Sequence, residues 1–157
     1  MGVRLRPMRE DEYDAFHADG VEGYARDIEE SGGFEREYAR AKSVADFERT
    51  LPQGLASPGQ FVLVVEDDDG RVVGTLWWAV RKSQIGTSYA FVYNVVIDEA
   101  ERGRGLGRAA MLALEIEVRA AGLDRIELNV FGGNEVARGL YRSLGFAESA
   151  VYMGKNV

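Results

Sequence analysis

A short segment rich in glycine and arginine carries the residue types best suited to binding an anion. It follows the apolar run 95–97 and reads Arg102-Gly-Arg-Gly-Leu-Gly-Arg108. Glycines let the backbone approach a ligand closely, and the first amides of a helix have no partner within it. Those amides, together with the helix dipole, favour negative charge. Because its three arginines lie in a chain of net charge -7, the segment indicates a small polyphosphate ligand rather than a nucleic acid.

Other interpretations are a plain glycine turn before an amphipathic helix and two further phosphate motifs. A Walker A loop needs Gly-Lys-Ser or Gly-Lys-Thr, which the chain lacks. Gly105, Gly107 and Ala110 fit the G-x-G-x-x-A turn of dinucleotide-binding folds. That turn follows its strand directly, whereas residues 98–102 intervene here, and the next strand ends in glycines rather than an acidic residue. The dinucleotide interpretation is therefore rejected.

A second block, at 128–146, reads L-x-V-x-x-x-N-x-x-A-x-x-L-Y-x-x-x-G-F. The matching residues are Leu128, Val130, Asn134, Ala137, Leu140, Tyr141, Gly145 and Phe146. Together with the R-x-x-G-x-G loop at Arg102, Gly105 and Gly107, this block resembles the GNAT superfamily of N-acetyltransferases. The resemblance is close over 95–146 and depends on element order elsewhere. Both motifs in this order are a more specific signal than either motif alone.

The resemblance implies an acetyl-CoA site in a gap where the fourth and fifth strands diverge. In the family, loop amides hold the pyrophosphate, which here implies Arg102, Gly103, Arg104, Gly105, Leu106, Gly107 and Arg108. The strand edge at Val95, Val96 and Ile97 would pair with the pantetheine amides. Asn134 would contact the cofactor arm in addition to capping its helix; the alternative is that it is a plain helix cap. Acetyl-CoA is thus the expected acyl donor, and no metal is expected.

Tyr141 is the residue that the resemblance implies for catalysis. When an amine attacks the thioester, a CoA thiolate leaves, and a phenol within hydrogen-bond distance can protonate it as general acid. Tyr141 would therefore contact the cofactor as well. On spacing alone, Tyr141 shares a helical stripe with Leu140 and Leu144 and would be an ordinary core residue. The L-Y-x-x-x-G-F context favours the catalytic role.

The general base stays open at this point. Many relatives carry a glutamate near the cofactor-binding end of the fourth strand, where this chain has Tyr93 and Asn94. The alternatives are water, Glu127 on the next strand, or a carboxylate of the N-terminal helices: Glu22, Asp27 or Glu30. His17 is the only histidine, and on an acidic helix it is expected to be solvated.

The N-terminal half contains residues relevant to binding of the amine acceptor, but they do not identify the amine. An acidic run over 27–37 suits a cationic amine such as a polyamine, an aminoglycoside or lysine, but is more simply a solvated helix face. Trp77 and Trp78 alternate across a strand, so one should face the core while the other can line a pocket. The leading interpretation is an N-acetyltransferase of small primary amines that acts by direct attack in a ternary complex. The alternatives are a protein N-terminal or lysine acetyltransferase and a non-catalytic acyl-CoA-binding module.

Hydrophobic periodicity and turn residues predict the elements that position these residues. Strands are predicted at 3–6, 61–66, 71–81, 89–97 and 125–130, with a final strand or hairpin at 147–157. Helices are predicted at 11–30, 34–51, 105–121 and 134–144. This order indicates an α+β fold with helices on both faces of a mixed sheet, and the family resemblance implies GNAT-like α/β/α layers. We expect about four helices around a mixed, mostly antiparallel sheet of six to seven strands, splayed between strands four and five.

Composition limits the remaining choices. The 157 residues, 46% of them hydrophobic, contain no repeat or linker and are expected to form a single N-acetyltransferase domain over 1–157. The lack of cysteine excludes disulfides, thiolate nucleophiles and Cys-based zinc sites. Without a signal-like or membrane-length apolar run, a cytoplasmic protein with no membrane partner is expected. A pI of about 4.8 disfavours nucleic acid as a partner. A homodimer and an acyl group other than acetyl stay open.

Overall fold

The computed structural model describes residues 2–157. Its helices are α1 (Glu10–Gly32), α2 (Arg36–Thr50), α3 (Leu106–Ala120) and α4 (Glu135–Ser143). Its strands are β1 (Val3–Pro7), β2 (Gln60–Asp67), β3 (Val72–Lys82), β4 (Ser88–Ile97) and β5 (Ile126–Leu128). Two short 3₁₀ turns, η1 (Gly54–Ala56) and η2 (Glu99–Glu101), lie in the connections. In this part of the chain, no helix combines the length and apolar character that a membrane crossing needs.

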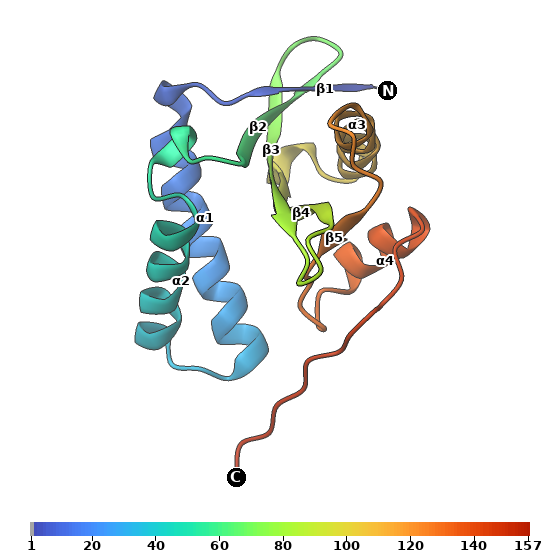
Figure 1. Cartoon of the computed structure of the whole chain (residues 1–157). Helices are drawn as coiled ribbons and strands as arrows, with labels where there is room; N and C mark the ends of the chain where they lie inside the picture. The colour runs from blue at the N-terminus through green and yellow to red at the C-terminus, as the bar shows by residue number, and fades with distance from the viewer. Residues whose placement is uncertain (1) are drawn as a thin grey trace.

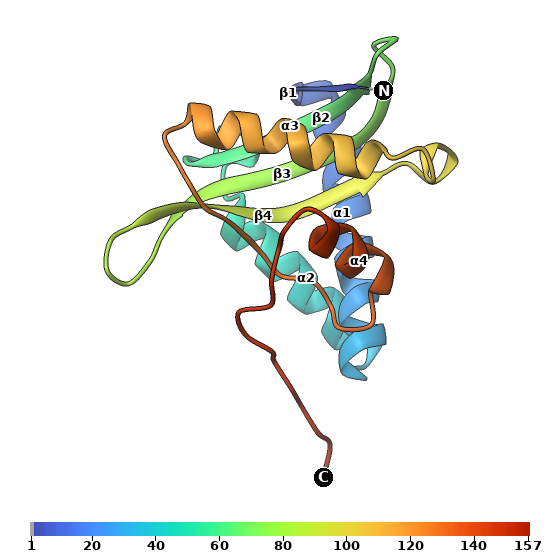
Figure 2. The ribbon, with the colours of Figure 1, turned by 90° about the vertical axis from the view of Figure 1, so that its right-hand side faces the viewer.

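The strands form one sheet in the order β1-β2-β3-β4-β5. The first four strands are antiparallel neighbours, and β5 runs parallel to β4. A parallel pair needs a crossover connection, which α3 supplies. Figure 1 shows α1 and α2 on one face of the sheet and α3 and α4 on the other, and in Figure 2 α3 lies across the strands. The predicted α/β/α layers are therefore confirmed.

An apolar cluster fills each side of the sheet. On the α3 side, strand residues including Trp78 pack against Leu114 and its neighbours. On the other side, Phe16 of α1 and Phe47 of α2 pack against Trp77. Trp77 and Trp78 thus alternate across the sheet as predicted. Both are buried, so the expectation that one of them lines an open pocket is wrong.

β4 contains an extra residue at the point where β5 leaves it. Trp77 of β3 lies opposite Asn94, whereas the next residue of β3 lies opposite Val92, so Tyr93 is the additional residue of a β-bulge. β5 pairs with β4 only as far as Val92. Beyond Val92, one edge of β4 has no strand partner within the described sheet. This is the splay that the family resemblance implies.

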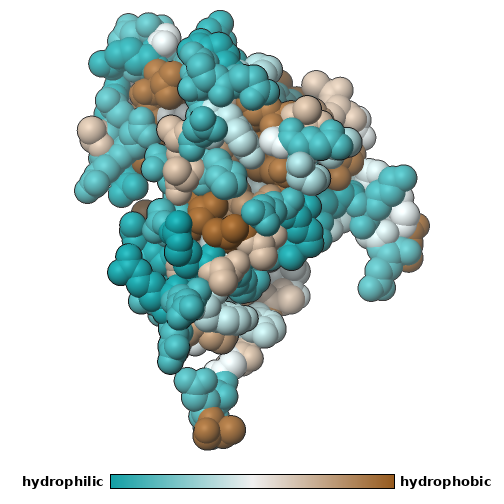
Figure 3. All heavy atoms as spheres, turned by 90° about the vertical axis from the view of Figure 1, so that its left-hand side faces the viewer, coloured by the Kyte–Doolittle hydropathy of each residue, from teal (hydrophilic) through white to brown (hydrophobic). Residues whose placement is uncertain are grey.

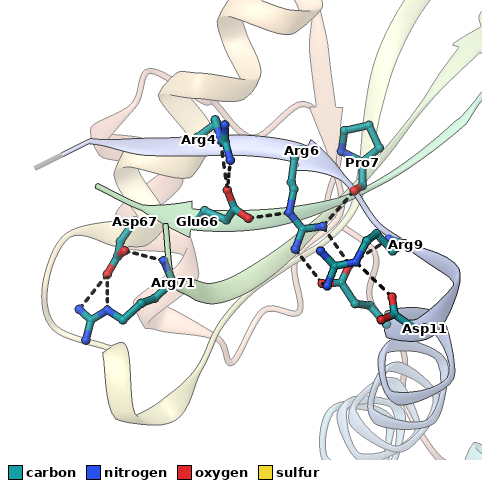
Figure 4. A network of polar contacts seen from close by, with 9 residues as sticks. Arg4, Arg6, Pro7, Arg9, Asp11, Glu66, Asp67 and Arg71 are labelled. Carbon is teal, nitrogen blue, oxygen red and sulfur yellow. Dashed lines mark hydrogen bonds and ion pairs between the residues drawn. The ribbon is translucent and has the colours of Figure 1, made fainter. Parts of the chain in front are cut away.

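An ion-pair network joins β1, β2 and the first turn of α1 (Figure 4). The carboxylate of Glu66 accepts from Arg6 Nε at 2.5 Å and from Arg4 Nε at 3.1 Å. The guanidinium of Arg6 also donates to both carboxylate oxygens of Glu12, at 2.7 and 2.9 Å. These hydrogen bonds, of which those from Arg6 have the largest effect, lower the pKa of Glu12 to about 2. The network therefore fixes the edge of the sheet to the start of α1.

The predicted strand or hairpin at 147–157 is wrong. These residues form neither strand nor helix, and the sheet has five strands rather than six or seven. The alternating apolar residues suit a strand, but a strand needs a neighbouring edge to supply its hydrogen bonds. In both ribbon views this segment instead runs away from the domain (Figures 1 and 2).

Candidate active site

The turn between β4 and α3 carries backbone amides without partners. Gly103 and Gly105 adopt positive φ angles of 78° and 75°, and Gly105 is the N-cap of α3. Within residues 2–157, the amides of residues 103–108 donate to no other protein group; the first amide to bond is that of Ala109, to the Gly105 carbonyl at 3.1 Å. Such a row of N–H groups at the positive end of a helix dipole can hold an anion.

The arginines of this turn contact neighbouring elements. Arg102 Nε donates to the last carbonyl of β4 at 3.1 Å. Arg104 forms an ion pair with Glu101. The guanidinium of Arg108 donates to the hydroxyl of Ser143 in α4 at 2.9 Å. All three side chains therefore contact neighbouring elements, while the backbone amides of the turn have no partner in the described chain.

The free edge of β4 leads directly into this turn. Val95, Val96 and Ile97 pair with β3 on one side and have no β5 partner on the other. Val95 and Ile97 pack against the α3-side cluster, whereas Val96 is exposed. A Cβ on Gly74 of β3 would lie 2.2 Å from the Val96 carbonyl oxygen, so glycine is needed for this close pairing.

α4 carries the two remaining predicted site residues. Asn134 caps the helix, because its Oδ1 accepts from the Ala137 amide at 3.1 Å. Tyr141 is half-buried against the α3-side cluster, with its ring 5.7 Å from that of Phe146. Burial raises the pKa of Tyr141 above its ordinary value, which already keeps the phenol protonated at neutral pH. No described residue hydrogen-bonds to its hydroxyl.

Contacts between the three elements bring these residues together. A Cβ on Gly107 would lie 3.5 Å from Leu140 Cδ2 of α4 and 3.8 Å from Ile97 Cγ1 of β4. The start of α3, the middle of α4 and the end of β4 therefore meet at one place. Glu22, Asp27 and Glu30 belong to α1, which covers the opposite face of the sheet (Figure 1).

Comparison with known proteins decides the family. The profile described as "Acetyltransferase (GNAT) family" matches residues 22–146. The chain belongs to the GNAT family. Because its members take their acyl group from acetyl-CoA, the protein is an acetyl-CoA-dependent N-acetyltransferase.

Individual relatives agree with this assignment. The N-acetyltransferase YdgE of Bacillus subtilis, itself uncharacterised, is 31% identical over 157 residues, which are 100% of this chain and 99% of YdgE. The crystal structure of YycN from Bacillus subtilis superposes with a TM-score of 0.92 at 30% identity, covering 99% of this chain and 98% of YycN. A mycothiol acetyltransferase of Thermobispora bispora is 36% identical over 96% of this chain, which corresponds to 48% of that protein.

β4 of this GNAT enzyme carries no carboxylate that could act as the general base. The fourth strand offers Tyr93 and Asn94 in place of glutamate. Glu127 of β5 accepts from Arg125 Nε at 2.8 Å, and Glu22 of α1 is ion-paired with Arg40. Both carboxylates already have a cationic partner. In residues 2–157, no group of three or more His, Asp or Glu side chains is arranged to hold a metal.

Two other expectations about the N-terminal helices can be compared with the structure. His17 is half-buried, with its ring 5.5 Å from Phe47 and 5.8 Å from Tyr13, so the prediction that it is solvated is wrong. All the acidic residues of the 27–37 run are exposed: Asp27, Glu29, Glu30, Glu35 and Glu37. The face formed by α1 and α2 is correspondingly mostly hydrophilic (Figure 3). The run therefore fits the solvated-face interpretation.

An aromatic cluster beside the splay was missed by the sequence analysis. The bulged Tyr93 stacks on Trp77 at 4.5 Å and meets the ring of Phe91 edge-on at 4.9 Å. The guanidinium of Arg81 lies 4.5 Å from the centre of the Phe91 ring. Tyr93 is 36% exposed, so it forms a surface next to the free edge of β4. No pattern within β4 itself indicates the bulge, because it depends on the register of β4 against β3.

Proposed function

We propose that the protein transfers an acetyl group from acetyl-CoA to the primary amine of a small molecule, by direct attack in a ternary complex. The observation that carries this proposal is the continuity of two donor surfaces. The unpaired edge of β4 at Val95, Val96 and Ile97 runs into the unpaired amides of residues 103–108. A strand edge suits the amides of pantetheine, and amides at a helix start suit a pyrophosphate.

In the proposed reaction, the amine nitrogen attacks the thioester carbonyl carbon, and the carbon–sulfur bond then breaks. The sulfur leaves with the electron pair and takes a proton from Tyr141 Oη, which regains one from solvent. Tyr141 suits this role because a phenol carries its proton at neutral pH, burial raises its pKa further, and no described residue competes for its hydroxyl. The Asn134 side-chain NH₂, which makes no bond to a described residue, is proposed to contact the cofactor arm.

The proton that the amine releases goes to water in this proposal. Glu127 and Glu22 are each bound by an arginine. Asp27 and Glu30 lie on α1 rather than beside Tyr141. A pH profile of acetylation that follows the acceptor's own amine pKa supports this assignment. If the rate also depends on the ionisation of a second group, and Glu127→Gln removes that dependence, Glu127 is the general base instead.

A small acceptor is favoured over a protein by two observations. The Thermobispora bispora relative is a mycothiol acetyltransferase, although this chain spans only 48% of that relative. The ring of Tyr93, 36% exposed and packed on the buried rings of Trp77 and Phe91, offers a small aromatic surface beside the splay. Acetylation of lysine or of a protein N-terminus is the rival within the same chemistry.

A thiol-release assay with acetyl-CoA tests the proposal. The panel should contain polyamines, aminoglycosides, amino sugars, aromatic amines and peptides with a free N-terminus or lysine. Release of CoA that depends on a small amine, with the acetylated amine identified by mass, supports the proposed function. Turnover confined to peptides assigns the rival substrate class. CoA binding without turnover of any amine assigns a non-catalytic acyl-CoA-binding module.

A further inference from the structure

The face of β3 and β4 that turns towards α1 and α2 carries an aromatic ring next to the splay, in a fixed position. Trp77 packs there against Phe16 and Phe47, and its Nε1 donates to Gln60 Oε1 at 2.8 Å. Tyr93 stacks on Trp77, with ring centres 4.5 Å apart and planes inclined by 23°. Because Trp77 is held by these contacts and Tyr93 is 36% exposed, the ring of Tyr93 is a ready surface for another planar group.

An arginine without an anionic partner lies one ring further along the same face. Phe91 meets Tyr93 edge-on at 4.9 Å, and the guanidinium of Arg81 lies over Phe91, 4.5 Å from the ring centre. Among the described residues, the exposed side chain of Arg81 has no hydrogen bond and no ion pair. The carboxylate of Glu127, opposite Phe91 on β5, is bound by Arg125 instead. A guanidinium that rests on a ring keeps its N–H groups at the rim, where they can bind a carboxylate through two hydrogen bonds.

The reacting end of acetyl-CoA comes next to this face. This step rests on the proposed function, in which the pyrophosphate lies at residues 103–108 and the pantetheine pairs with β4 from Ile97 back to Val95. The thioester then lies near Tyr93, because the splay closes where β5 begins to pair with β4, at Val92. The proposed general acid packs on the α3 side of the sheet. The amine therefore approaches from the side that carries the aromatic ring and the arginine.

We propose that the acceptor is a small primary amine with a planar apolar body and a carboxylate at the end opposite the amine. The amine lies at the thioester, the planar body stacks on the exposed ring of Tyr93, and Arg81 binds the carboxylate. This order of groups matches the order of the splay, Tyr93 and Arg81 along the face. Tyr93 and Arg81 thus determine specificity and take no part in proton transfer. The rival is a cationic acceptor bound by the exposed acidic residues of α1.

Acetylation of a matched set of amines tests the acceptor class. The set contains para-(aminomethyl)benzoate, benzylamine, which lacks the carboxylate, phenylalanine, which has both groups at one end, and spermidine, which is cationic. At saturating acetyl-CoA, kcat/KM is expected to be highest for para-(aminomethyl)benzoate. Arg81→Gln should lower that value by roughly tenfold to a hundredfold, as expected for a hydrogen bond to a charged group, and leave benzylamine unchanged. Tyr93→Ala should lower the values for both benzylic amines by about two- to tenfold and leave spermidine unchanged.

Lys82→Gln is the matched control for the charge. Lys82 is the next residue of β3 and is also exposed, but successive side chains of a strand point to opposite faces. Its kcat/KM for para-(aminomethyl)benzoate should equal that of the native chain. An equal loss in Lys82→Gln and Arg81→Gln would mean that net charge alone attracts the acceptor, and it would overturn the assignment to Arg81.

Binding separates this inference from the proposed function. Calorimetry of para-(aminomethyl)benzoate uses the protein saturated with CoA, which has no acetyl group to transfer. A Kd that rises in Arg81→Gln but not in Lys82→Gln supports the inference; if no amine is acetylated in the same preparation, only the proposed transfer fails. Undetectable binding, a higher kcat/KM for spermidine, or full activity of Arg81→Gln overturns the inference. The proposed transfer still holds in those cases wherever a small amine is acetylated.

Discussion

The guanidinium of Arg108, near the start of α3, donates to the hydroxyl oxygen of Ser143 at the end of α4, 2.9 Å away. The same hydroxyl donates to the carbonyl of Leu140 at 2.6 Å, one residue before Tyr141. The turn proposed to hold the pyrophosphate is thus coupled to the helix that carries the proposed general acid. Ser143 acts as a positioning residue in this arrangement.

Ser143→Ala should lower kcat/KM for acetyl-CoA by roughly two- to tenfold, since a hydrogen bond contributes about 0.5 to 1.5 kcal/mol. Steady-state kinetics at several acetyl-CoA concentrations measure this loss. Ser149→Ala is the control, because Ser149 makes no hydrogen bond within the described chain. Equal kcat/KM for the two variants contradicts the positioning role.

Acetyl-CoA and CoA should raise the melting temperature, whereas NAD and ATP should raise it much less. The reason is that the β4 edge and the amides of residues 103–108 form a combined surface for pantetheine and pyrophosphate. A ligand at a hundredfold excess over its Kd adds about 2.7 kcal/mol to the stability of the native state. A melting scan in which NAD produces the same shift as CoA rules out this site.

Gly105→Val should remove most CoA binding, while Arg104→Ala should weaken it by less. Gly105 has a φ of 75°, which a branched residue adopts only at a cost of about 1 to 3 kcal/mol. A Cβ there meets no protein atom within 4 Å, so the added methyls would occupy the space left for the ligand. Isothermal calorimetry gives the order of the two Kd values, and the reverse order would assign the binding to side-chain charge.

The features that sequence reasoning predicted are those that local chemistry determines. The glycine-rich turn that was expected to open a helix does so at Gly105, the N-cap of α3, and Asn134 caps α4 as expected. Each of these depends on a few neighbouring residues. The β5 splay was predicted through the family resemblance rather than from the residues themselves.

The features that it missed depend on contacts between distant segments. The bulge at Tyr93 arises from the register of β3 against β4, which one strand does not encode. His17 packs against Phe47 of another helix, so its own acidic neighbours gave the wrong environment. Residues 147–157 alternate like a strand, but whether they pair depends on an edge elsewhere, and in the structure they stay unpaired.

The stability of the fold should decrease with acid through the network at β1. Bonding to arginines lowers the pKa of Glu12 to about 2, and that of Glu66 below its ordinary value. Because both pKa values are lower in the folded state, their stabilisation is complete above about pH 5 and is lost as the pH falls from there towards 2. Glu12→Gln should therefore reduce the free energy of unfolding at pH 7 but not near pH 2.

Urea unfolding of Glu12→Gln and the native chain at several pH values measures this difference. Glu10→Gln is the control, since Glu10 lies in the same exposed turn and makes no hydrogen bond or ion pair within the described chain. A difference between Glu12→Gln and the native chain that stays constant with pH contradicts the contribution of Glu12 to the network.

The most direct test of the account is the chemical step in Tyr141→Phe. The ring would still pack against Phe146 and the α3-side cluster, so stability and CoA affinity should stay close to those of the native chain. Only the proton donor is lost, and single-turnover acetylation should slow by roughly ten- to a thousandfold. If the phenylalanine variant transfers acetyl at the native rate while chemistry is rate-limiting, Tyr141 is a packing residue and the thiolate leaves without it.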